Sequence, residues 1–370
     1  MPSISRRLSA IPAVETLLQR AELADVLGRV PRLVVVQAVR AVLARERARL
    51  AAPGERAAPA ESLARAAAAE AEALAGPGLR RVLNATGVVL HTNLGRAPLA
   101  PAAGAAVAAV AAGYCSLEYD TATGRRGERG AGVERWLQRL TGAEAALCVN
   151  NGAAALLLVV SALAAGRRVL VSRGELVEIG GSFRIHEILE RSGAELVEVG
   201  TTNRTHLRDY ERALEGRRDV AVLLRVHPSN FRVEGFTARP TLAELAGLAR
   251  RRRVALVEDL GSGALVDLAP LGVGHEPTVA ESLAAGAEVV TCSGDKLLGG
   301  SQAGLVLGRR RLLARVRRDP LARAVRMDKL ALAALEATLP LYAEPDRALR
   351  EVPALAMLGL GPAELEARAR

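Results

Sequence analysis

The chain has 370 residues, half of them hydrophobic and only 2% aromatic, which suits one large domain plus a smaller one with a core of Ala, Val and Leu. Its net charge of +10 is typical of proteins with an anionic partner such as phosphate or nucleic acid, although basic solvated surfaces are also common. Three scattered cysteines without a C-x-x-C pair, and five histidines without metal-ligand spacing, exclude a disulfide framework and a patterned metal site.

No segment has the pattern of a membrane anchor or a signal peptide. The longest apolar helical run, Ala153–Ala165, is too short to span a bilayer, and the basic N-terminus lacks a continuous apolar stretch before Glu15. Since no disulfide pattern is present either, we expect a cytoplasmic protein.

The first part of the chain, residues 1–78, is predicted to be a small helical domain. Apolar residues recur at helical spacing in 13–30 and in 33–50, and Pro31 separates these stretches. A loop at 51–62 precedes an Ala- and Glu-rich helix that ends near Ala75. The Gly-Pro-Gly sequence at 76–78 then marks the domain boundary.

From about residue 140 onward, short apolar runs of β type alternate with amphipathic helical stretches. This alternation predicts an α/β fold with a mostly parallel central sheet and helices on both faces. We place this large domain at 79–335 and the start of a C-terminal domain at 336–370. The expected strands carry the sequences AALCVN, RRVLVSR, AELVEVG, VAVLLRVH, RVALVEDLG, AEVVTCSG and AGLVLG.

Lysine is almost absent from this sequence. Of the 50 basic residues only Lys296 and Lys329 are lysines, and the others are arginines. Arginine stays protonated in proteins, whereas the neutral amine of a lysine attacks carbonyls to form Schiff bases. Unless it was kept by chance, Lys296 is therefore a candidate for covalent chemistry, because it follows a predicted strand. Lys329 lies in a predicted helix and is expected to be structural.

Three strand ends carry residues of interest, because ligands of such folds bind at the carboxyl ends of strands. The turn Asn150–Gly152 opens a helix whose first N–H groups suit an anion. Asp259 ends another strand, where a buried acid needs a cation or a donor, and Ser293 shortly precedes Lys296. Taken singly, an ordinary turn and a capping or salt-bridged acid are the better explanations of the first two positions.

Together these residues match pyridoxal 5′-phosphate (PLP). This cofactor needs an amine for its aldehyde, a carboxylate for its pyridinium nitrogen and a cup for its phosphate. We assign the amine to Lys296 and the carboxylate to Asp259. The phosphate cup is assigned to Asn151, Gly152 and Ala153, with Ser293 as a further phosphate contact.

Eight longer stretches of the sequence are distinctive, and they run from about residue 80 to 345. They are LNATGVVLHTNLGRAPL (83–99), EYDTATGRRGERG (118–130), SRGELVEIGGSFRI (172–185), EVGTTNRTHLRDY (198–210), RVHPSNFRVEGFT (225–237), VEDLGSGALVDL (257–268), SGDKLLGGSQAG (293–304) and RMDKLALAALEATLPLY (326–342). In these stretches and their order the sequence resembles the bacterial selenocysteine synthases, the L-seryl-tRNA(Sec) selenium transferases. The helical N-terminal part is similar in kind.

The resemblance implies a fold-type-I PLP-dependent transferase. Such an enzyme converts L-seryl-tRNA(Sec) to selenocysteinyl-tRNA(Sec) with selenophosphate as donor, through a PLP-bound aminoacrylyl intermediate. It further implies that Lys296 removes the α-proton, that the N-terminal domain grips the tRNA, and that the chains form a homodecamer built from dimers. Family members continue well beyond this length, so the C-terminal domain is expected to be incomplete.

The same resemblance supports three arginines as binders of the anionic selenium donor. Arg323 and Arg326 stand three residues apart, which places them on one face of a predicted helix. Arg96 is the third candidate. A solvated basic face is the alternative for all three.

Other positions near the expected site have less definite roles. His227 and Asn230 are expected to line the cofactor ring, although a packed core histidine is an equally good interpretation. Arg125, Arg126 and Arg129 lie in a Gly-rich loop that suits the cofactor phosphate, the selenium donor or the tRNA end.

Two positions depart from the family pattern, and two other functions stay open. Arg225 stands where Lys is common, and Pro228 stands where Thr is common, which removes a hydroxyl and a backbone donor. One alternative function is a PLP-dependent lyase acting on a small amino acid or an amino-sugar phosphate, although such relatives tend to lack the N-terminal domain. The other is a non-enzymatic tRNA-binding relative.

Overall fold

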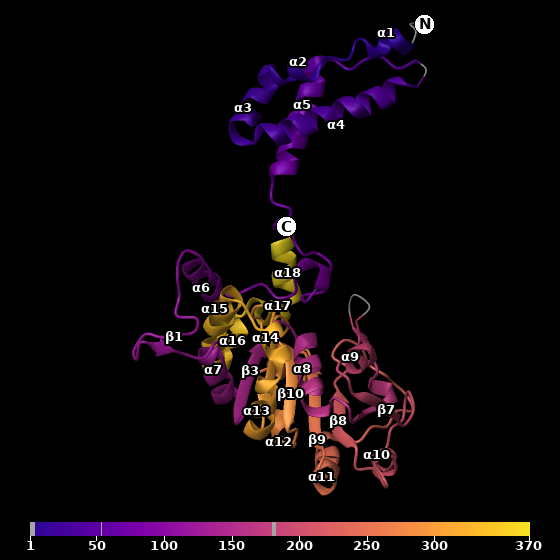
Figure 1. Cartoon of the computed structure of the whole chain (residues 1–370), viewed down its shortest axis with the longest axis vertical. Coiled ribbons are helices and arrows are strands. Elements are labelled where there is room, and N and C mark those ends of the chain that lie inside the picture. The colour runs from indigo at the N-terminus through magenta and orange to yellow at the C-terminus, as the bar shows by residue number, and fades with distance from the viewer. Residues whose placement is uncertain (1–3, 53, 180–182) are drawn as a thin grey trace. The chain divides into compact units, whose positions relative to one another are not determined.

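The computed structural model describes residues 4–52, 54–179 and 183–370. It divides into two compact units, residues 1–83 and residues 84–370, which we describe separately (Figure 1). The division falls a few residues after the Gly-Pro-Gly sequence at 76–78.

The first unit is helical, as predicted. Its longest helix, α4 (Arg32–Leu50), begins directly after Pro31, because proline is excluded from helix interiors. Val39 and Leu43, one turn apart on α4, are fully buried and face the core of this unit. The remaining helices are α1 (Ile4–Leu8), α2 (Val14–Leu18), α3 (Ala21–Arg29) and α5 (Ala60–Ala75).

The second unit is built on a seven-stranded sheet with the order β3-β11-β10-β9-β8-β4-β7. All its strands run in parallel except β11, which is antiparallel to both of its neighbours. Each strand lies within one of the seven apolar runs, which confirms the predicted mostly parallel sheet. The strands are β3 (Ala145–Val149), β4 (Arg168–Ser172), β7 (Glu195–Val199), β8 (Val220–Val226), β9 (Ala255–Gly261), β10 (Val289–Ser293) and β11 (Gly304–Gly308).

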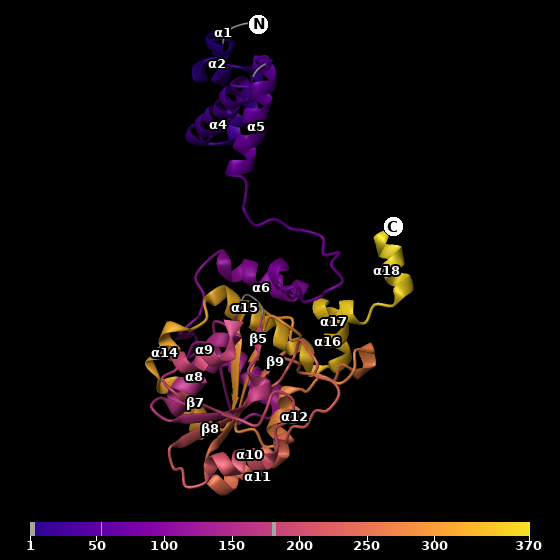
Figure 2. The ribbon, with the colours of Figure 1, turned by 90° about the vertical axis from the view of Figure 1, so that its right-hand side faces the viewer.

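Helices cover both faces of this sheet. On β3, Leu147 and Val149 face one buried core, and Ala146 and Cys148 face the other, because successive side chains of a strand alternate. In Figure 2, α8 (Gly152–Ala164) and α9 (Ile185–Arg191) lie on one side of the strands. On the other side lie α12 (Val279–Ala284) and α16 (Pro345–Glu351). Four of the helices of this unit are α7 (Ala131–Thr141), α8 (Gly152–Ala164), α13 (Arg310–Arg318) and α15 (Lys329–Thr338).

Residues 336–370, which we expected to begin a separate C-terminal domain, pack within the second unit. Leu339, Tyr342 and Val352 belong to the same buried core as Val133 of α7. This segment forms η4 (Leu339–Ala343), α16 (Pro345–Glu351), α17 (Pro353–Leu358) and the exposed α18 (Pro362–Ala369).

The remaining elements of the second unit complete the fold. They are η1 (Thr92–Leu94), α6 (Pro101–Ala111), β1 (Tyr119–Asp120), β2 (Arg125–Arg126), η2 (Arg173–Glu175), β5 (Glu178–Ile179), β6 (Phe183–Arg184), α9 (Ile185–Arg191), α10 (Leu207–Leu214), α11 (Leu242–Arg252), η3 (Ala269–Leu271), α12 (Val279–Ala284) and α14 (Pro320–Ala324). In the part of the chain that the structure describes, no helix combines the length and apolarity needed to cross a bilayer.

Several predicted site residues lie at the carboxyl edge of the sheet. The parallel strands β8, β9 and β10 end there, and α8 starts there directly after β3. Open α/β sheets bind their ligands at this edge.

Candidate active site

Lys296 lies in the turn that follows β10. This turn is tied to the end of β9, since the Leu297 N–H donates to the Ser262 carbonyl at 3.1 Å. Burial lowers the pKa of the Lys296 amine below its ordinary value, and the Arg96 guanidinium lowers it further. A lowered pKa increases the fraction of neutral amine, which is the form that attacks an aldehyde.

Asp259 lies on β9 beside Thr291 of the neighbouring strand β10. The Thr291 hydroxyl donates a hydrogen bond of 2.7 Å to Oδ1 of Asp259. Burial raises the pKa of this carboxyl, while the Thr291 hydrogen bond and the positive charge of Lys296 oppose the rise. A desolvated acid held in this way is suited to pair with a cationic ring nitrogen.

The start of α8 and the end of β10 form a small cradle. Asn151 is the N-cap of α8, and its side chain accepts the Ala154 N–H at 2.9 Å. The N–H groups of Gly152 and Ala153 belong to the first turn, where no intrahelical acceptor exists. A Cβ atom added to Gly152 would lie 2.6 Å from the Ser293 Oγ, so this hydroxyl adjoins the helix start. An N–H-lined cradle of this kind fits a phosphate.

His227 follows β8 directly and lies next to Asp259. Its backbone N–H donates to the Asp259 carbonyl at 2.9 Å, and its Nε2 lies 3.1 Å from Oε1 of Glu276. The His227 side chain is 19% exposed and lines a cavity together with Pro228 and Asn230. The structure therefore places it at the edge of the site rather than inside the packed core.

Arg96 reaches the same region from a loop before α6. Its backbone is left-handed, with φ of 59°, and the next N–H, that of Ala97, donates to the Asp295 carbonyl at 3.2 Å. The Arg96 guanidinium lies 3.0 Å from Oδ2 of Asp295. Arg96 is thus anchored to the residue that precedes Lys296.

Arg323 and Arg326 do not share a helix face, so that prediction was wrong. Helix α14 ends at Ala324, and Arg326 lies in extended backbone that forms a bridge with Val149 of β3. The carbonyl that precedes Arg326 accepts the Asn150 N–H at 2.7 Å. The chain therefore leaves the helix to pair with the end of β3.

Glu118 gathers three arginines close to this bridge. Its carboxylate accepts a hydrogen bond from Arg129 at 2.8 Å and one from Arg126 at 2.9 Å, and it lies 3.5 Å from Nη1 of Arg326. The Arg129 hydrogen bond is the main reason why the pKa of Glu118 lies below its ordinary value. Among the described residues, Arg125 and Arg323 have no ion pair, so the structure leaves them outside this cluster.

Lys329 has a structural role, as predicted. Its amine donates to the carbonyls of Val110 and Gly113 at 2.9 and 3.0 Å, at the C-terminal end of α6. A cation placed there satisfies carbonyls that lack intrahelical partners.

Four residues of the site were not selected from the sequence. They are Thr291, Glu276, Asp295 and Glu118. A signal existed for Thr291, because in paired parallel strands it falls beside Asp259 at the same edge. The other three are acidic residues of a kind common on surfaces. Their partners, His227 and the arginines, become evident only from tertiary contacts.

The described residues fit PLP in their chemistry. An amine of lowered pKa, a buried carboxylate and an N–H-lined cradle come together at one edge of a parallel sheet. In the described ranges no group of three His, Cys, Asp or Glu side chains forms a metal site. This fold and these groups define the fold-type-I class of PLP-dependent enzymes.

Comparison with known proteins identifies the family. The profile of the L-seryl-tRNA selenium transferases matches residues 82–370, and the profile of the selenocysteine synthase N terminal matches residues 8–47. The chain belongs to the L-seryl-tRNA selenium transferase family, whose members are enzymes.

Individual relatives are similar over most or all of the chain. An L-seryl-tRNA(Sec) selenium transferase of Moorella thermoacetica is 52% identical over 98% of this chain and 76% of its own length. One from Methylocella silvestris is 52% identical over 100% of this chain and 78% of its own length. One from Nitratidesulfovibrio vulgaris is 57% identical over 79% of this chain and 62% of its own length.

Solved structures support the fold alone. A D-glucosaminate-6-phosphate ammonia-lyase superposes with a TM-score of 0.57 and 22% identity, covering 72% of this chain and 69% of that one. A structure of SPT with PLP superposes with a TM-score of 0.50 and 16% identity, covering 66% of this chain and 59% of that one.

Proposed function

We propose that this protein converts L-seryl-tRNA(Sec) to selenocysteinyl-tRNA(Sec), with PLP as cofactor and selenophosphate as the selenium donor. The observation that carries the proposal is the convergence of Lys296, Asp259 and the cradle of Gly152 and Ser293 in a chain of this family. When bound, PLP supplies an electron sink for the carbon that loses its proton.

The residues of the chain then have separate tasks. Lys296 would hold the aldehyde carbon of PLP, Asp259 would hold the ring nitrogen, and the cradle would hold the phosphate. Once freed, the Lys296 amine would be positioned to remove the α-proton of the seryl group. Its lowered pKa favours the neutral form that accepts a proton. The β-hydroxyl group would take up a proton and leave as water. Selenium would then add to the β-carbon, while water cleaves the P–Se bond of selenophosphate and phosphate is released.

The selenium donor is an anion, and one arginine lies beside the Lys296 turn while another lies at the end of β3. Arg96 is anchored to Asp295, and Arg326 lies beside the end of β3 with the Glu118 cluster. We propose that Arg96 and Arg326 bind the donor directly. Arg323, exposed on the neighbouring short helix, is proposed as a further contact.

The tRNA is proposed to be held mainly by the helical domain at 1–78. Support comes from the match of residues 8–47 to the N-terminal profile of the family, and the net charge of +10 on the whole chain favours an RNA partner. We further propose that the chains assemble as a homodecamer built from dimers and that they work in the cytoplasm, where charged tRNAs are used.

A direct assay tests this function. The purified protein, loaded with PLP, is incubated with selenophosphate and either seryl-tRNA(Sec) or seryl-tRNA(Ser), and selenocysteine on the tRNA is measured. We expect product from the first tRNA only, and none with Lys296→Ala. Turnover of free serine or an amino-sugar phosphate without tRNA would instead support a small-molecule lyase. Binding of tRNA by a protein that retains no PLP would support the non-enzymatic alternative.

A further inference from the structure

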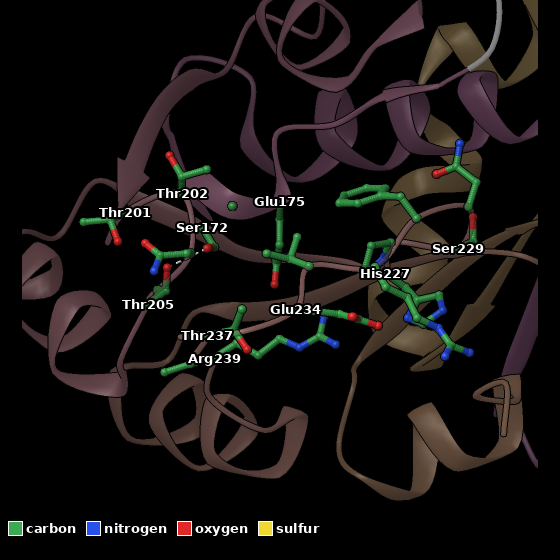
Figure 3. Close-up of a pocket in the computed structure, with 18 of the residues that line it drawn as sticks. Ser172, Glu175, Thr201, Thr202, Thr205, His227, Ser229, Glu234, Thr237 and Arg239 are labelled. Carbon is green, nitrogen blue, oxygen red and sulfur yellow. Dashed lines mark hydrogen bonds between the residues drawn. The ribbon is translucent and has the colours of Figure 1, made fainter. Parts of the chain in front are cut away.

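A cavity of about 640 Å³ adjoins the cofactor site and shares His227 with it (Figure 3). Its walls include the loop after β7, residues 200–205, and the long loop after β8, residues 227–241. These loops are bonded to each other, because Asn203 Nδ2 donates to the Phe236 carbonyl at 2.7 Å and the Thr205 N–H donates to the Ala238 carbonyl at 2.8 Å. The cavity is therefore framed by two loops that are bonded to each other. Neither the proposed PLP site nor the proposed selenium donor site assigns a ligand to it.

Two exposed aromatic side chains lie in the second of these loops. The whole sequence contains three phenylalanines, and two of them, Phe231 and Phe236, are 39% and 82% exposed here. Phe231 lines the cavity, and the Arg204 guanidinium lies over the Phe236 ring, 5.7 Å from its centroid. Core packing does not explain exposed rings in so aromatic-poor a chain, whereas stacking of nucleic acid bases on such rings does.

The polar groups of the cavity suit a nucleotide as well. Arg232 and Arg239 supply positive charge for a phosphate, and the carboxylate of Glu234 is available as an acceptor for a ribose hydroxyl or an exocyclic amine. Figure 3 shows Arg239 and Glu234 extending into the same part of the cavity, opposite the threonines of the loop at 200–205.

We propose that this cavity binds the 3′-terminal nucleotide of the aminoacylated tRNA, with the base on Phe231 and the phosphate near Arg232 and Arg239. The inference rests on the proposed function. In an aminoacyl-tRNA the amino acid is esterified to the terminal ribose, so the terminal nucleotide lies one ester group away from the carbon that reacts at Lys296. A cavity of nucleotide size that meets the cofactor site at His227 satisfies this constraint.

The test is a double-mutant cycle on binding, with the full-length protein loaded with PLP. The affinity for uncharged tRNA(Sec) is compared with that for the same tRNA lacking its terminal adenosine, in the wild type and in Phe231→Ala. We expect loss of the adenosine to weaken wild-type binding about tenfold and to leave Phe231→Ala binding unchanged. Tyr114→Ala, which removes an exposed ring outside the cavity, should behave like the wild type.

Three other results would overturn the inference, and only the last of them would also overturn the proposed function. If loss of the terminal adenosine weakens binding to Phe231→Ala as much as it weakens binding to the wild type, the base does not stack on Phe231. If Arg239→Ala leaves tRNA binding intact but raises KM for selenophosphate, the cavity belongs to the selenium donor. If wild-type protein fails to bind intact tRNA(Sec), the proposed function itself fails together with the cavity assignment. Retained PLP absorbance in each variant shows that a loss of binding does not come from misfolding.

Discussion

The hydroxyl of Thr291 donates a hydrogen bond of 2.7 Å to Oδ1 of Asp259, across the parallel pair β9 and β10. This bond holds the carboxyl oxygen in place and favours its ionised form, because a donor stabilises a carboxylate. The acid proposed to hold the PLP ring is thus positioned by a residue on the strand that leads to Lys296.

Thr291→Val should weaken PLP binding through Asp259. Burial already raises the pKa of Asp259 and the Thr291 bond lowers it, so the pKa rises further when the bond is lost. The ionised acid is present above its pKa and is lost as pH falls, so the defect should grow toward acidic pH. We expect about a tenfold weaker PLP affinity, measured by absorbance titration.

Thr338→Val is the matched control for this substitution. Thr338 is also fully buried, but its hydroxyl donates to the Ala334 carbonyl of its own helix at 2.8 Å. This control should leave PLP affinity unchanged. An equal loss in both variants would show that the effect of Thr291→Val is general destabilisation.

Gly152→Ala should block the phosphate cradle. The added Cβ would lie 2.6 Å from the Ser293 Oγ, a distance that forces the hydroxyl or the helix start to move. We expect PLP affinity to fall at least tenfold. Gly104→Ala is the control, because Gly104 of α6 has open space around it and alanine favours a helix by up to about 1 kcal/mol. Wild-type affinity in Gly152→Ala would place the phosphate elsewhere.

Arg96→Gln should shift the pH dependence of PLP attachment. The Arg96 charge lowers the pKa of Lys296, so its removal raises that pKa toward the ordinary value of a lysine. The neutral amine exists above the pKa, and the pH at which attachment becomes fast should therefore move upward. Stopped-flow rates of PLP incorporation against pH measure this shift. A downward shift would contradict the electrostatic account.

Lys329→Met should reduce stability without affecting the cofactor. The substitution removes two hydrogen bonds to carbonyls at the end of α6, with an expected loss of about 1–2 kcal/mol in the free energy of unfolding. Urea denaturation measures the loss, and PLP titration should give the wild-type affinity. Impaired PLP binding would assign Lys329 a role in the site.

The sheet was predictable from the sequence because its signal is local. Each strand is a short apolar run with glycine or polar residues at its ends. Asp259 and Ser293 could be selected because they stand near the ends of two such runs. The rarity of lysine drew attention to Lys296 for a chemical reason that does not depend on tertiary structure.

The rest of the site depends on contacts between distant segments. Arg326 had helical spacing from Arg323, but pairing with the end of β3 outweighs that local preference. Glu118 and Glu276 acquire their partners only through loops that fold back on the sheet. The cavity beside His227 likewise arises from two loops joined by hydrogen bonds between residues more than 30 positions apart.

The covalent bond to PLP is the central claim, and reduction with borohydride tests it most directly. The purified protein, incubated with PLP, is reduced, digested and analysed by mass spectrometry. We predict a single pyridoxyl group, on Lys296, and none on Lys329. Protein that carries no pyridoxyl group, or that carries it on Lys329, would contradict the account.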